Sequence, residues 1–204
     1  MDDPDYWLRY ELAAVVGPDA TVQSVAQALR VASNDARAAP VASLEAGLAM
    51  VPVTAELAAR LSADALRARN LGQLSGRDPA AALRRQHLAG PESGFLRLTP
   101  AIVALVEAVS VLGTLAYIEA DYIGLEGRQA AALWESGQLI MGPRLLGRRE
   151  PFDPPGAPIT VALRGLGVEN RGRRDAFLVA GLDRYRTTEQ WLDADTVVEP
   201  RDGA

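Results

Sequence analysis

Glu119 and Asp121 are the residues whose type and spacing come nearest to a chemical site. They lie two positions apart in a segment that alternates like a β-strand, which puts both carboxylates on one face, roughly 6.5–7 Å apart at Cα. Two carboxylates so placed can bind a hard divalent cation or share acid–base work. The pattern supplies no further ligand. The sequence therefore predicts no metal, no cofactor and no catalytic residue.

The composition excludes several other kinds of site. The chain has no cysteine and no lysine, which removes thiolate nucleophiles, cysteine zinc sites and Schiff-base chemistry. Its single histidine, His87, lies in the context RRQHLAG. A multi-histidine metal site is therefore impossible, and this context predicts an exposed helix end. No phosphate-binding loop and no dinucleotide-binding glycine pattern is present.

The carboxylate pair must be positioned by a β-meander over residues 114–142. Two turns divide it into three strands, a four-residue loop at 124–127 and a two-residue loop at 136–137. The predicted pairs across the first hairpin are Tyr117 with Trp134, Glu119 with Ala132, and Asp121 with Ala130.

An apolar helix precedes the meander. Thr99 is suited to cap it, Pro100 to begin it and Gly113 to end it. We expect this helix, over 99–112, to cover one face of the meander. The residues of that face are Ile118, Ala120, Tyr122, Ala131, Leu133 and Ile140.

The other face carries the candidate site, which consists of Tyr117, Glu119, Asp121, Arg128 and Trp134. Opposed aromatic residues on a polar face are either offered to a partner or covered by another part of the chain. We predict a partner-binding surface that is at least partly exposed. The alternatives are an ordinary solvated sheet face, and a face buried beneath the C-terminal helices.

The N-terminal part predicts a β-α-β-α unit. Strands are expected at 6–16 and 41–53, and helices from Asp19 to Ala32 and from Thr54 onward. Residues 71–94 form an irregular connection with one short helix. Shorter helices are expected at 159–166, at 174–182, and after the capping box of Thr187 and Gln190.

These elements predict an α+β fold with a mixed, mainly antiparallel sheet and helices packed mostly on one face. We expect a single domain over residues 1–204, with 1–70 and 95–195 as a possible subdivision joined by 71–94.

Net charge bears on the partner and the compartment. The chain carries −5, which suits a basic protein partner and argues against nucleic acid, although arginines surround Tyr185 as they do in nucleic-acid binders. No apolar run reaches the roughly 18–20 residues of a membrane span. The acidic start MDDPDYW is unlike a signal peptide. We expect a cytoplasmic protein with no membrane partner, and the sequence predicts no oligomeric state.

Residues 114–192 resemble small uncharacterised bacterial proteins with the pattern Y-x-E-x-x-Y-F-G-G-x-G-x-Q, followed by a tryptophan and a C-terminal T-E-x-W. Ile123 and Leu125 depart from that pattern. Some of these proteins resemble immunity partners of secreted bacterial toxins. The matching residues are Tyr117, Glu119, Tyr122, Gly124, Gly127, Gln129, Trp134 and Trp191.

The resemblance and the lack of a catalytic motif lead to one functional hypothesis. We expect a non-enzymatic, protein-binding or inhibitory accessory protein of the toxin-immunity type, with another protein, such as a basic toxin domain, as its partner. One alternative is an enzyme or small-molecule binder with a pocket containing Glu119 and Asp121. A self-assembling structural protein is the other.

Overall fold

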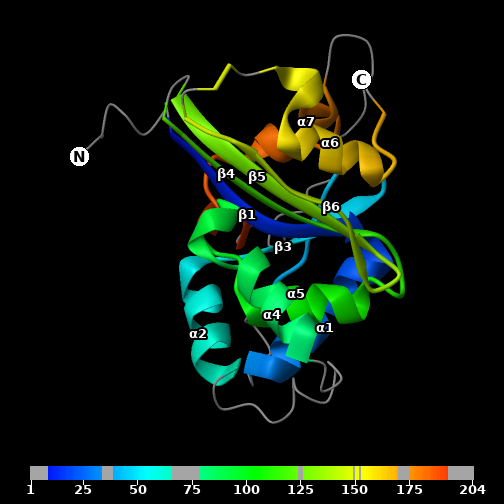
Figure 1. Ribbon diagram of the computed structural model, residues 1–204. Helices are drawn as coiled ribbons and strands as arrows, with labels where there is room; N and C mark the ends of the chain where they lie inside the picture. Colours follow the sequence, from blue (N-terminus) through cyan, green and yellow to red (C-terminus); the bar gives the residue numbers. More distant parts are fainter. Residues whose placement is uncertain are drawn as a thin grey trace, which may run out of the picture.

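The computed structural model describes residues 9–33, 39–65, 79–123, 126–148, 150–151, 153–169 and 175–192. A six-stranded antiparallel sheet forms the central layer, with strands in the order β2-β3-β1-β4-β5-β6 (Figure 1). The strands are β1 (Arg9–Pro18), β2 (Ala42–Ser43), β3 (Leu48–Pro52), β4 (Leu115–Ile123), β5 (Glu126–Glu135) and β6 (Gln138–Leu146). The α-helices are α1 (Asp19–Ser33), α2 (Ala55–Ala65), α4 (Pro79–Leu88), α5 (Pro100–Val109), α6 (Pro158–Gly165) and α7 (Ala176–Val179).

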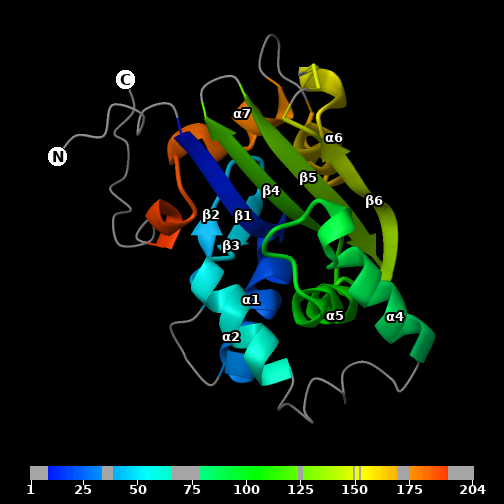
Figure 2. The ribbon, with the colours of Figure 1, turned by 60° about the vertical axis from the view of Figure 1, so that its left-hand side comes forward.

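Helices cover both faces of the sheet, as Figure 1 and Figure 2 show. The larger layer contains α1, α2, α4 and α5, and the smaller layer on the opposite face contains α6 and α7. Short 3-10 helices, η4 (Leu182–Arg184) and η5 (Glu189–Leu192), follow α7. The predicted α+β fold with a mainly antiparallel sheet is therefore confirmed. No described helix is long and apolar enough to cross a membrane.

β1 lies in the middle of the sheet and pairs with β3 on one side and β4 on the other. Ala13 and Val15 pack in the core of the larger helical layer, whereas Leu12 and Val16 pack in the core of the smaller one. The prediction of a strand with one buried face is therefore wrong over the described part of 6–16. A central strand between two helical layers buries both of its faces.

The strand predicted over 41–53 is instead a hairpin. β2 and β3 pair antiparallel, and the turn between them contains Ala46 and Gly47 at φ of 58° and 73°. Alternating apolar residues continue through this turn, so periodicity alone did not reveal it. The left-handed conformation is easily adopted by Gly47 and uncommon for Ala46.

The meander is present, but its first hairpin has a different register. Tyr117 pairs with Ala132, and Trp134 pairs with Leu115, because Ile123 pairs with Glu126 and only residues 124–125 lie between them. The shift is by two residues, so every side chain keeps the face that was predicted. The ring of Tyr122 lies where a Cβ on Gly127 would be, so the observed register places this ring over a position without a side chain.

α5 packs on the opposite face of the meander from the one predicted. Ile102, Val103 and Val106 share a core with Tyr117 and Trp134. The face that α5 was expected to cover, with Ile118 and Leu133 at its centre, packs against Ile159, Ala162 and Leu163 of α6. Both faces of the meander are apolar enough to be covered, so hydrophobicity did not decide which helix covers which face.

Several helix ends agree with their sequence signals. Thr99 Oγ1 accepts a hydrogen bond from the Ile102 amide at 3.3 Å, and Thr187 and Gln190 form the predicted capping box. α5, however, ends at Val109 rather than near Gly113. Ser110 accepts hydrogen bonds from the amides of the β5–β6 turn, Ser136 at 3.0 Å and Gly137 at 3.1 Å, so this turn binds the helix end.

Candidate functional site

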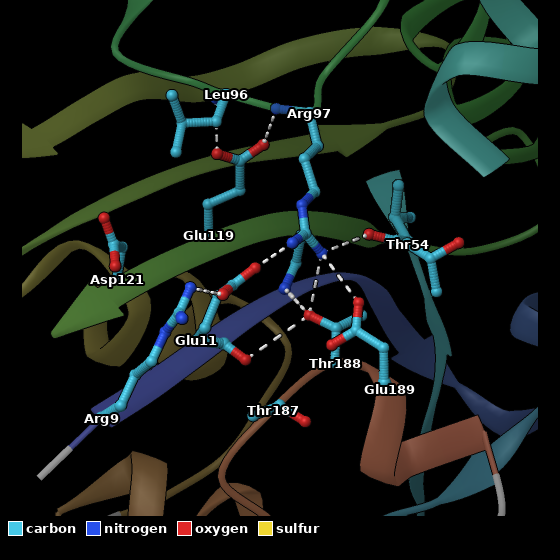
Figure 3. Close-up of polar contacts among 12 residues, drawn as sticks. Arg9, Glu11, Thr54, Leu96, Arg97, Glu119, Asp121, Thr187, Thr188 and Glu189 are labelled. Atoms are coloured by element: carbon cyan, nitrogen blue, oxygen red, sulfur yellow. Dashed lines mark hydrogen bonds and ion pairs between the residues drawn. The ribbon is translucent and has the colours of Figure 1, made fainter. Parts of the chain in front are cut away.

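Glu119 is a buried carboxylate whose hydrogen-bonding capacity is used inside the protein. Its Oε2 accepts from the Leu96 amide at 2.6 Å (Figure 3). Its Oε1 accepts from the amides of Arg97 at 2.7 Å and Leu98 at 3.1 Å, and from the Tyr117 hydroxyl at 2.8 Å. Glu119 thus attaches the segment that precedes α5 to the middle of β4, and both of its oxygens accept hydrogen bonds from this protein.

Tyr117 and Trp134 are fully buried, each with 0% exposure, beneath the layer that contains α5. The expectation that this face is at least partly exposed is therefore wrong for Tyr117, Trp134 and Glu119. Burial raises the pKa of Tyr117 well above its ordinary value, and the Glu119 carboxylate raises it further. The hydroxyl consequently stays protonated and donates to Glu119.

Asp121 and Arg128 are the two predicted site residues that reach solvent. They are directly paired between β4 and β5, with 3.8 Å between Arg128 Nε and Asp121 Oδ2. Arg148 also donates to Asp121 Oδ2 at 3.2 Å. Glu11 on β1 pairs with Asp121 on its other side, so a row of three charged residues crosses the end of the sheet.

Arg97 is a central residue that sequence reasoning missed. Its guanidinium donates to Glu11, to the Val53 carbonyl at 3.2 Å and to Thr188 Oγ1 at 3.2 Å (Figure 3). Thr188 Oγ1 in turn accepts from the Ala13 amide at 3.0 Å. These partners are up to 91 positions away in the chain, so no local spacing could indicate them.

A small pocket of about 140 Å³ lies between β1, β4, β5 and the segment before α5. Three of the five predicted site residues, Glu119, Asp121 and Arg128, line it; Tyr117 and Trp134 do not. Three arginines, three acidic residues, several small residues and two leucines line it. Its lining includes Arg9, Arg97, Arg128, Glu11, Glu119, Asp121, Ala13, Gly94 and Ala130. Across the described ranges, no group of three or more histidine, aspartate, glutamate or cysteine side chains could hold a metal ion.

The outer edge of β6 is a second candidate surface, and the sequence analysis did not point to it. β6 is the last strand of the sheet, and all of its residues except the half-buried Met141 and Leu146 are exposed. Leu139, Ile140 and Leu145 are apolar and exposed by 40%, 52% and 46%. Within the described part of the chain, the backbone of β6 hydrogen-bonds only to β5.

A groove of about 890 Å³ runs beside β6, between this strand and α4. His87, Leu83 and Leu88 line it from α4, and Leu139 and Pro143 line it from β6. α4 itself packs on α5 and on η2 (Pro91–Ser93). The single histidine is therefore exposed near the end of a helix beside this groove, as predicted.

No family model matches this chain, and no curated protein or solved structure is significantly similar to it. The resemblance of residues 114–192 to small bacterial proteins therefore stays a prediction.

Proposed function

We propose that this protein is a non-enzymatic protein-binding protein whose partner adds a strand to the outer edge of β6. The observation that carries this proposal is a long, exposed and apolar edge strand. A row of unpaired backbone N–H and C=O groups at a sheet edge is a template for another chain, and strand addition is a common mode of peptide recognition.

The opposite edge of the same sheet shows how this protein protects an edge. β2 contains only Ala42 and Ser43. Arg184 donates to the Ser43 carbonyl, and the amide of Glu45, just beyond β2, donates to the Ala180 carbonyl at 3.1 Å. β6 has nine residues and lacks such a cover among the described residues. Its protection consists of Pro143, which has no amide to donate, the charge of Arg144, and two register irregularities in its pairing with β5.

Apolar side chains beside this edge supply area that a partner can bury. Leu83 on α4 is 56% exposed and lines the groove with Leu139. An added strand directs alternate side chains to the two faces of the sheet, so every second residue of a partner segment would lie over this groove. Main-chain hydrogen bonds would contribute affinity, and side-chain contacts in the groove would contribute specificity.

The buried carboxylate argues against the enzymatic alternative. Glu119, one of the two carboxylates in that alternative, accepts four hydrogen bonds from this chain. A general acid or base needs a free position facing its substrate.

A toxin-neutralising role is the specific form of this proposal that the resemblance implies. A net charge of −5 would speed association with a basic partner. Tyr117, Glu119 and Trp134 of the face that first suggested such a role are buried, so the β6 edge takes its place as the proposed binding surface.

The test is affinity purification from the source organism with wild-type protein and two variants. Ile140→Arg places a charge on the proposed surface, and Val31→Arg, at a residue that is 77% exposed on α1, is the matched control. We expect one protein in near-stoichiometric amount with wild type and Val31→Arg, and its loss with Ile140→Arg. Equal recovery with both variants, or no partner at low salt, would contradict the proposal.

A further inference from the structure

The pocket between β1, β4 and β5 contains charged groups of both signs whose hydrogen-bonding capacity is only partly used among the described residues. Glu11 is bound by Arg9 and Arg97, and both oxygens of Glu119 accept hydrogen bonds. The guanidinium of Arg128 makes no hydrogen bond among the described residues, and its Nε is 3.8 Å from Asp121 Oδ2. Among the described residues, Asp121 receives one hydrogen bond, on Oδ2 from Arg148, and its Oδ1 accepts none.

The charges of this pocket disfavour a simple anion or a simple cation. Arg9, Arg97 and Arg128 are balanced by three carboxylates in the same lining. An anion bound at Arg128 would also face Asp121, and a cation bound at Asp121 would face Arg128. A ligand that carries both charges on neighbouring atoms would satisfy both residues and leave the balance of the pocket unchanged.

The size of the pocket limits the ligand to a few atoms. Its volume of about 140 Å³ is close to that of an engineered cavity of about 150 Å³ that holds benzene, a molecule of about six heavy atoms. Beside the two charged ends of a ligand, this volume leaves room for a short side chain only. Arg9 and Leu96, both exposed, place its opening at the surface.

We propose that this pocket binds a small zwitterionic α-amino acid, with its carboxylate on the guanidinium of Arg128 and its ammonium on Oδ1 of Asp121. Planar guanidinium groups bind carboxylates through two parallel hydrogen bonds, and the free edge of Arg128 is suited to this geometry. The site is separate from the β6 edge, so it does not depend on the proposed protein partner.

The test is a two-dimensional ¹H–¹⁵N NMR titration of the full chain with L-alanine. We expect saturable shifts of the Leu96, Asp121 and Arg128 amides, with half-saturation below about 10 mM. Arg128→Gln and Asp121→Asn should each weaken binding about tenfold or more, because each removes a hydrogen bond to a charged group. Arg144→Gln, on exposed β6 outside the pocket lining, is the matched control and should bind as wild type does.

Acetate and ethylamine carry the two charges of the ligand on separate molecules. We expect each to bind at least about tenfold more weakly than L-alanine. Acetate that binds as tightly as L-alanine would show an anion site and overturn the proposal. It would equally be overturned if L-alanine gave no saturable shift, or if Arg128→Gln, shown to be folded by its dispersed spectrum, bound with unchanged affinity.

Discussion

Replacing Glu119 with alanine should destabilise the protein strongly, although it removes only one carboxylate. Glu119 accepts hydrogen bonds from three backbone amides and the Tyr117 hydroxyl. A hydrogen bond to a charged group contributes about 1.5–3 kcal/mol, so the four would sum to about 6–12 kcal/mol if they were independent. They share one acceptor, and the part-buried amides of Leu96 and Arg97 can bind water after the substitution. We therefore expect a loss of about 4 kcal/mol in the free energy of unfolding.

Two milder variants calibrate this expectation. Tyr117→Phe removes one donor and leaves the three amides, so it should cost about 1 kcal/mol. Asp121→Asn alters the partly exposed ion pair between Asp121 and Arg128, and it should cost less than about 1 kcal/mol. Urea denaturation, monitored by circular dichroism, measures the free energy of unfolding of all three variants. A cost below about 1 kcal/mol for Glu119→Ala, as for a solvated carboxylate, would refute the hydrogen-bonded anchor.

Two further predictions concern the core around this anchor. Trp134→Ala should lower the free energy of unfolding by about 3–5 kcal/mol. Trp134→Phe should cost clearly less, because the buried indole N–H has no hydrogen-bond partner among the described residues and its removal breaks no such bond. Equal costs of the two variants in urea denaturation would contradict this prediction. The raised pKa of Tyr117 means that the unfolded chain loses this proton first as pH rises past the ordinary value of 10.0. The contribution of Tyr117 to the free energy of unfolding should therefore be fully present below pH 10 and decrease above it. The free energy of unfolding should decrease less with alkaline pH in Tyr117→Phe than in the wild type. An identical decrease in both proteins would contradict this prediction.

Local signals in the sequence were sufficient to predict individual turns and helix starts. Thr99 caps α5 because its hydroxyl reaches an amide three residues on, a contact within one turn. The two-residue turn at Ser136 and Gly137 has positive φ at both positions, 52° and 78°, as expected of a tight hairpin. These features depend on neighbouring residues alone, which is why they could be predicted.

The features that the sequence analysis missed depend on distant contacts. The hairpin register depends on how Tyr122 packs over Gly127, and the pattern of alternation is the same for either register. Both faces of the meander are apolar, so the choice of α5 for the Tyr117 face is decided by tertiary packing. Arg97 joins segments from three regions of the chain, and nothing near it in sequence distinguishes it from a surface arginine.

The candidate site was predicted in part. Alternation correctly placed Glu119 and Asp121 on one face, and both line the same pocket with Arg128. The exposure of these side chains could not be predicted, because it depends on where the segment before α5 lies in the fold. The edge position of β6 was also hidden, since strand order in a sheet is a property of the whole chain.

Strand addition at β6 is the central claim, and hydrogen–deuterium exchange tests it most directly. The exchange of backbone amides would be compared between the free protein and its complex with the partner recovered by affinity purification. We expect new protection of amides within Gln138–Leu146, and none for residues of the short β2 edge. Unchanged exchange throughout β6 in a saturated complex would contradict the account.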